Sequence, residues 1–294
     1  MARADHDEDR PFRGIPAPRR GFTFVELLVA TLLMTVVGAV LVNSFRIEMR
    51  HRADAEVTAE TYQGLVAALD SLMRDVRLAG ACLPTRPLFV PLSGAHDGRT
   101  DSITVRTGAI GPTSACAVAT LMAPLEAGET ALALDDVSGF QVGGLGYVAG
   151  AVRGEIFRVT AVSGPSGPGT IRTDTALAQR YPSGGGVYAL EEHTYAVDTA
   201  TYEQPVLTRS VNRQAAQPLA RGIEWLRIRY RLDQSCPTCT VVDLPSDDPT
   251  WAQVNEVLIS AMAVSRQSLS TGERLRESAT VTIQPLNLEA PPAS

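Results

Sequence analysis

The sequence predicts an α+β protein in which a long N-terminal α-helix packs on an antiparallel β-sheet domain. Three observations predict this class. Residues 22–42 form an apolar run of 21 residues, which as a helix is long enough to cross a membrane. Apolar residues then continue at helical spacing to residue 79. Beyond that point, short segments alternate between apolar and polar residues, as strands with one buried face do.

The composition is that of a globular protein with a core, because 45% of its residues are hydrophobic and 20% are charged. The net charge of −6 and an aromatic content of 5% disfavour nucleic acid as a partner without excluding it. The four histidines show no metal-ligand spacing, and hydrolase or phosphate-loop motifs are missing. We therefore expect no enzyme activity, no catalytic residue, no cofactor and no metal site.

The N-terminal 21 residues look like a segment that is removed. They are polar and rich in proline and arginine, and these arginines predict that this end stays in the cytoplasm. The apolar run that follows ends without the small-residue site of a secretory signal. We therefore expect the run to remain as a membrane anchor. Its one charge is Glu26, whose burial in hydrocarbon costs several kcal/mol unless the carboxylate is paired or solvated.

The stretch Gly21-Phe22-Thr23-Phe24-Val25-Glu26 resembles the cleavage and methylation site of type IV prepilins and pseudopilins. The resemblance implies that a prepilin peptidase cuts between Gly21 and Phe22 and methylates the new amine of Phe22. It also assigns Glu26 to assembly, where the carboxylate would pair with an N-terminal amine and fix axial register. The alternative for Glu26 is a carboxylate that is simply solvated or protonated near the interface.

The helix is predicted to extend from residue 22 to about residue 80, with residues 22–42 in the membrane. Proline is absent from 47–79, and Gly80 and Pro84 form a stop signal. Gly64 is the one weak position. The apolar face that should pack on the sheet consists of Tyr62, Leu65, Leu69, Leu72 and Val76.

Residues 81–288 are expected to form an extracytoplasmic β domain, and residues 289–294 a disordered tail. Glycine-rich turns between short apolar runs predict an all-β insertion at about 120–190. Alternating patterns predict strands at 101–107, 155–160, 221–232, 254–264 and 279–286.

All four cysteines follow the anchor and so share one compartment. We favour a structural disulfide for Cys236 and Cys239, over half of a zinc site or a thioredoxin-like active site. If these two pair locally, Cys82 and Cys116 remain to pair with each other.

Two surface features suggest weaker possibilities. Arg227, Arg229 and Arg231 should share one strand face, which is either solvated or able to meet an anionic partner. The acidic loop at residues 246–248 could bind calcium through its carboxylates, although it lacks the spacing of an EF-hand loop.

Further patterns resemble the larger minor pilins of the PilW kind, among them Arg74 to Gly80 and the segment from Gly222 to Tyr230. The resemblance implies a single-pass inner-membrane protein with a periplasmic C-terminal domain, later part of a pilus at or near the tip. Its expected partners are prepilin peptidase, other pilins, the inner-membrane assembly platform and membrane lipid. Two alternatives stay open: a type II secretion pseudopilin, and a membrane-anchored ligand-binding or adhesin module.

Overall fold

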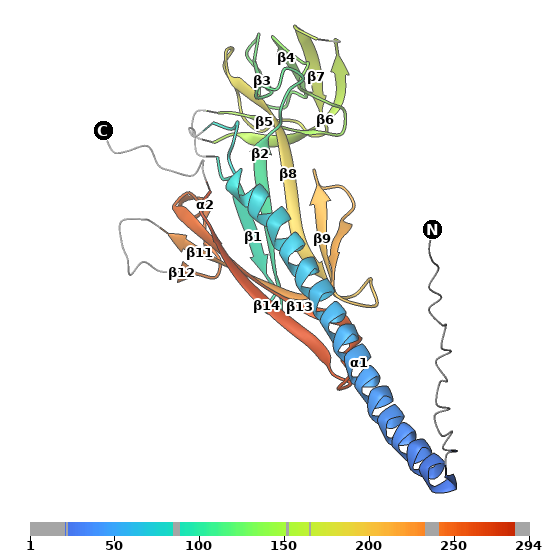
Figure 1. Cartoon of the computed structure of the whole chain (residues 1–294). Coiled ribbons are helices and arrows are strands. Elements are labelled where there is room, and N and C mark those ends of the chain that lie inside the picture. The colour runs from blue at the N-terminus through green and yellow to red at the C-terminus, as the bar shows by residue number, and fades with distance from the viewer. Residues whose placement is uncertain are drawn as a thin grey trace, which may run out of the picture. The chain divides into compact units, whose positions relative to one another are not determined.

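The computed structural model describes residues 21, 23–84, 89–150, 153–164, 166–232 and 241–285. The chain divides into two compact units, Met1–Arg52 and Ala53–Ser294. A long N-terminal helix is followed by antiparallel sheets, which confirms the predicted α+β class (Figure 1).

Helix α1 extends from Phe24 to Arg77. In the first unit, residues 24–52 are exposed except Gly38, which is half-buried. In the second unit, residues at spacings of three and four are buried, which is the pattern of a helix with one apolar face. The buried residues are Val57, Thr61, Leu65, Ala68, Leu69, Leu72 and Val76. Tyr62 was predicted on this face, but it is exposed.

The first sheet has ten strands, in the order β1-β2-β8-β5-β6-β7-β4, with β3 and β9 paired to β8 and β10 paired to β9. All its pairs are antiparallel. The strands are β1 Leu92–His96, β2 Asp101–Gly108, β3 Val118–Thr120, β4 Ala131–Leu134, β5 Leu145–Val148, β6 Glu155–Ser163, β7 Gly169–Thr173, β8 Gly186–Asp198, β9 Val206–Val211 and β10 Gln217–Arg221.

Six of these strands close into a small barrel. The pairs β3·β8, β8·β5, β5·β6, β6·β7 and β7·β4 are completed by a bridge between Leu121 and Leu134. The barrel has its own core, which includes Leu132, Phe157 and Tyr181. At Gly146 a Cβ would lie 2.5 Å from the ring of Phe157, so glycine is required there by close packing.

The second sheet has four strands in the order β12-β11-β13-β14. Their bounds are β11 Ile223–Leu232, β12 Val241–Val242, β13 Val254–Ser268 and β14 Arg274–Ile283, with the short helix α2 at Asp248–Trp251. The last strand was predicted to begin at residue 279. It begins at 274 instead, after a turn at Gly272, because pairing with β13 holds its charged first residues extended.

Both sheets share a second core with the C-terminal half of α1, including Leu65, Leu72, Ile103, Tyr195 and Ile259. The two sheets also meet at an edge of β11. The backbone N–H of Leu226 donates to Thr100 Oγ1 at 3.1 Å, and that of Ile228 donates to Asp101 Oδ2 at 2.6 Å. These side chains satisfy edge groups that would otherwise be left unpaired.

Candidate functional site

The first turn of α1 is closed by a reciprocal cap between Thr23 and Glu26. The backbone N–H of Glu26 donates to Thr23 Oγ1 at 3.2 Å, and the backbone N–H of Thr23 donates to Glu26 Oε2 at 2.9 Å. The Thr23 hydroxyl donates to the same oxygen at 3.0 Å. This is a capping box, which satisfies backbone donors that a helix start leaves free.

Two of the predicted site residues flank this cap. Gly21 is exposed, and a Cβ built on it would meet nothing within 4 Å. Phe22 lies outside the described residues. Thr23 was not predicted to have a role, although threonine three residues before glutamate is the sequence signature of a capping box.

The helix that follows the cap carries exposed apolar side chains along its first part. The relative exposure of Phe24 is 76% and that of Met34 is 78%. The helix is long and apolar enough to cross a membrane, and none of its most apolar window is buried inside the chain. A soluble protein rarely exposes so much contiguous apolar surface, so this part of α1 requires lipid or other helices around it.

Comparison with protein families identifies this same segment. Residues 17–42 match the prokaryotic N-terminal methylation motif. The chain has the N-terminus of a type IV prepilin. The capping box lies within this motif, and the exposed apolar part of α1 begins inside it.

Two further comparisons give less information about this chain. A type IV-like pilin from Thermus thermophilus matches 77% of this chain and 97% of its own, at 10% identity and a TM-score of 0.36. No similar sequence is found among curated proteins.

In the second unit, a polar cluster joins α1 to β8. Asp75 Oδ2 lies 2.5 Å from His193 Nδ1 and accepts a hydrogen bond of 2.5 Å from the hydroxyl of Tyr195. Glu191 Oε1 lies 3.0 Å from His193 Nε2. The hydrogen bonds to Asp75 and Glu191 outweigh burial and raise the pKa of His193 to about 9. His193 is therefore a cation between two carboxylates at neutral pH.

The remaining groups of this cluster respond to the same charges. Burial alone would raise the pKa of Asp75, but hydrogen bonds from His193 and Tyr195 lower it below its ordinary value. Burial and the neighbouring Asp75 raise the pKa of Tyr195 to about 12. Ser71 contacts Tyr195 at 3.4 Å rather than His193. The cluster therefore lacks the pairing of a nucleophile with a base that hydrolases use.

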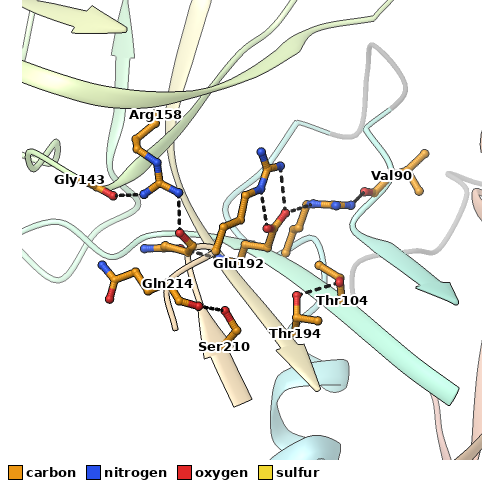
Figure 2. Close-up of polar contacts among 11 residues, drawn as sticks. Val90, Thr104, Gly143, Arg158, Glu192, Thr194, Ser210 and Gln214 are labelled. Carbon is orange, nitrogen blue, oxygen red and sulfur yellow. Dashed lines mark hydrogen bonds and ion pairs between the residues drawn. The ribbon is translucent and has the colours of Figure 1, made fainter. Parts of the chain in front are cut away.

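A second buried cluster lies where β8 leaves the barrel (Figure 2). The carboxylate of Glu192, 3% exposed, accepts from Arg106 Nε at 2.7 Å and from Arg213 Nε at 2.9 Å. Burial would raise the pKa of Glu192, but the hydrogen bonds from Arg213 and Arg106 lower it overall. Removing either cation would leave part of a buried charge uncompensated.

Arg158 ties the barrel to the turn between β9 and β10, as Figure 2 shows. It donates to the carbonyl of Gly143 at 2.7 Å and to that of Asn212 at 2.9 Å. Asn212 and Arg213 have φ of 50° and 59°, a left-handed conformation that costs non-glycine residues energy. Contacts with Glu192 hold both turn residues in place.

One disulfide links the end of α1 to the barrel. Cys82 and Cys116 form a bond with a Cα–Cα distance of 5.4 Å. Cys236 and Cys239 lie outside the described residues, so their predicted pairing stays a prediction.

A groove of about 460 Å³ lies beside α1, lined in part by Glu60, Gly64, Glu203, Arg221 and Arg266. Among the residues that the structure describes, no group of three or more His, Cys, Asp or Glu side chains could hold a metal ion.

Of the three arginines predicted to share one face of β11, one is paired and two are exposed. Arg231 forms an ion pair with Glu256 at 2.6 Å. Arg227 and Arg229 are exposed on the same face of β11.

Proposed function

We propose that this chain is a minor pilin subunit of a type IV pilus, incorporated at or near the fibre tip, where it helps to prime assembly. The observation that carries the proposal is the position of the methylation motif. It covers the start of a helix whose apolar side chains are exposed. Such a helix suits first the bilayer and then a bundle of similar helices.

The open surroundings of Gly21 support processing between Gly21 and Phe22. A side chain at Gly21 would meet nothing within 4 Å, so neither folding nor packing calls for glycine there. A peptidase that must bring the backbone close to its own active site does call for it. Prepilin peptidase is therefore the first partner, acting on the cytoplasmic side.

Glu26 is assigned to the register of helices within the fibre. The capping box holds its carboxylate at the very start of α1, four residues after the amine that cleavage would create at Phe22. In a low dielectric that amine and the carboxylate strongly favour pairing, either within one chain or between neighbours.

The β domain suits a subunit that caps or decorates a fibre. The barrel adds a separate core, and the Cys82–Cys116 disulfide and the Glu192 cluster fasten it to the rest of the domain. The other partners are pilins, the inner-membrane assembly platform and, before assembly, lipid. The N-terminus would be cytoplasmic and the β domain periplasmic until the subunit enters the fibre.

The test of this proposal begins with processing. In cells that possess the peptidase, the intact mass should show loss of residues 1–21 and one added methyl group. All 26 basic residues are arginine, so the α-amine is the only amine of the mature chain. An amine-directed label should therefore mark Phe22 alone.

The matched variants are Gly21→Val and Gly38→Ala. The first should stay full-length, whereas the second, inside the anchor, should be processed normally. A mature wild-type chain that keeps residues 1–21 would refute the proposal.

A type II secretion pseudopilin would share the processing step, and an anchored adhesin would not need the fibre. Sheared pili decide between them. A minor pilin is recovered with those pili and its deletion lowers their number, whereas a pseudopilin deletion blocks protein secretion and leaves pili intact.

A further inference from the structure

The four-stranded sheet has one face that contributes to no core. Its inner face, with Leu226, Ile228 and Ile259, belongs to the core shared with α1. The opposite face carries Trp225, Arg227 and Arg229 of β11, Leu258 and Met262 of β13, and the exposed side of β14. We call this surface the outer sheet face.

Cross-strand pairing arranges the outer sheet face in three rows. Each row crosses β11, β13 and β14 in that order and ends on a hydroxyl of β14. The rows are Trp225–Met262–Ser278, Arg227–Ser260–Thr280 and Arg229–Leu258–Thr282. The hydroxyl-bearing residues of β14 are exposed, and the Ser260 and Thr280 hydroxyls lie 2.9 Å apart.

The charges on this face are only partly balanced. Arg231 pairs with Glu256 at 2.6 Å, and Arg276 pairs with Glu224 at 2.9 Å. Arg227 and Arg229, in contrast, are exposed and form no side-chain hydrogen bond or ion pair with any residue that the structure describes. Two positions along one strand place their Cα atoms about 7 Å apart. Two adjacent guanidinium groups are thus available for carboxylates, which they can bind in a bidentate manner.

We infer that the outer sheet face binds a linear acidic polysaccharide, one whose sugars carry carboxylates. Arg227 and Arg229 take the carboxylates, and the hydroxyls of β14 exchange hydrogen bonds with the sugar hydroxyls. Trp225 is half-buried and lies two positions before Arg227 on β11. It offers an amphipathic ring to the apolar face of a sugar.

The position of the outer sheet face on a fibre follows if the proposed function holds. Helix α1 contributes to the core on the inner face, so a fibre held together by these helices leaves the outer face on its surface. Binding itself does not depend on assembly.

Nucleic acid fits this surface less well. A single half-buried tryptophan does not form the series of stacking platforms that single strands use.

The experiment uses the full chain in detergent micelles and compares its mobility in native gels that contain polygalacturonate, neutral dextran or single-stranded DNA. The test variant is Arg227→Gln/Arg229→Gln. The control, Arg153→Gln/Arg172→Gln, removes the same charge from two exposed arginines, one just before β6 and one in β7 of the barrel. A Trp251→Phe variant leaves Trp225 as the only tryptophan, so its fluorescence reports contact at this face.

Polygalacturonate should retard the wild type and the control, and dextran should retard neither. The test variant should bind at least 10-fold more weakly, and oligogalacturonate should change the Trp225 fluorescence. The inference is overturned if the wild type is not retarded, if the control loses as much as the test variant, or if DNA retards the wild type as strongly. Normal processing and pilus incorporation alongside any of these results would leave the proposed function standing.

Discussion

His193 Nδ1 of β8 lies 2.5 Å from Asp75 Oδ2 of α1, although 118 positions separate the two residues in the sequence. This contact fastens the C-terminal half of the helix to the first sheet. It also makes the stability of the second unit depend on pH through two groups that shift in opposite directions.

The first prediction concerns alkaline pH. The pKa of His193 in the folded chain is about 9, above its ordinary value of 6.5. Its contribution to the free energy of unfolding is therefore complete below pH 6.5 and is lost as pH rises through 9. The free energy of unfolding, measured by urea denaturation, should therefore fall by about 2–3 kcal/mol between pH 7 and pH 10. His193→Gln should already be destabilised at pH 7 and should show a flatter alkaline loss.

Asp75 governs the acid side of the same profile. Its pKa is lowered from 3.8, so its contribution is present above that value and is lost as pH falls below it. His51→Gln is the matched control, because His51 is exposed on α1. An identical alkaline slope for His51→Gln and His193→Gln would contradict the assignment.

The second prediction concerns the Glu192 cluster. Glu192→Gln keeps the shape but leaves Arg106 without its buried counter-ion, so the free energy of unfolding should fall by about 3–5 kcal/mol. Glu203→Gln, at an exposed position, should change it by less than about 0.5 kcal/mol. Urea denaturation measures the free energy of unfolding of both variants. Equal losses would contradict a stabilising role of the Glu192 cluster.

The third prediction concerns the Cys82–Cys116 disulfide, which closes a loop of 34 positions. Cys82→Ser/Cys116→Ser should lower the free energy of unfolding by about 3–4 kcal/mol. Non-reducing peptide mapping should find this link in the wild type. The comparison variant is Cys236→Ser/Cys239→Ser, whose short loop predicts a smaller loss. A link between Cys82 and Cys236 would refute the pairing.

Local patterns in the sequence predicted much of the fold. The alternation at 101–107 lies within strand β2, and the helical spacing from Leu65 to Val76 lies on the buried face of α1. Tyr62 was assigned to that face by spacing alone, but it is exposed. The start of β14 was missed because Arg274, Arg276 and Glu277 hide the alternation of an edge strand.

Contacts between distant residues could not be predicted in this way. The bridge that closes the barrel and the Asp75–His193 contact depend on pairings that local periodicity does not encode. The prepilin motif was evident because its signal is local. The Thr23–Glu26 cap is equally local and was predictable from threonine three residues before glutamate, but Glu26 was interpreted only through its charge.

The fourth prediction separates two roles of Glu26. If Glu26 serves only to cap the helix, then Thr23→Val, which removes the hydroxyl of the cap, should have the same effect as Glu26→Gln. Loss of a cap costs about 1 kcal/mol, a loss of stability that the long apolar helix can tolerate. We therefore expect Thr23→Val to be processed, inserted and assembled at a level close to that of the wild type.

The most direct measurement is the amount of each variant in sheared fibres relative to its amount in the membrane. The account predicts that Glu26→Gln and Glu26→Val insert and are processed but fall at least 10-fold in this ratio, because a buried amine without its carboxylate costs several kcal/mol. Thr23→Val should keep a ratio within about twofold of the wild type, as a lost cap alone would allow. Wild-type ratios for both Glu26 variants, or an equal fall for Thr23→Val, would contradict the claim that Glu26 sets the position of this subunit in the fibre.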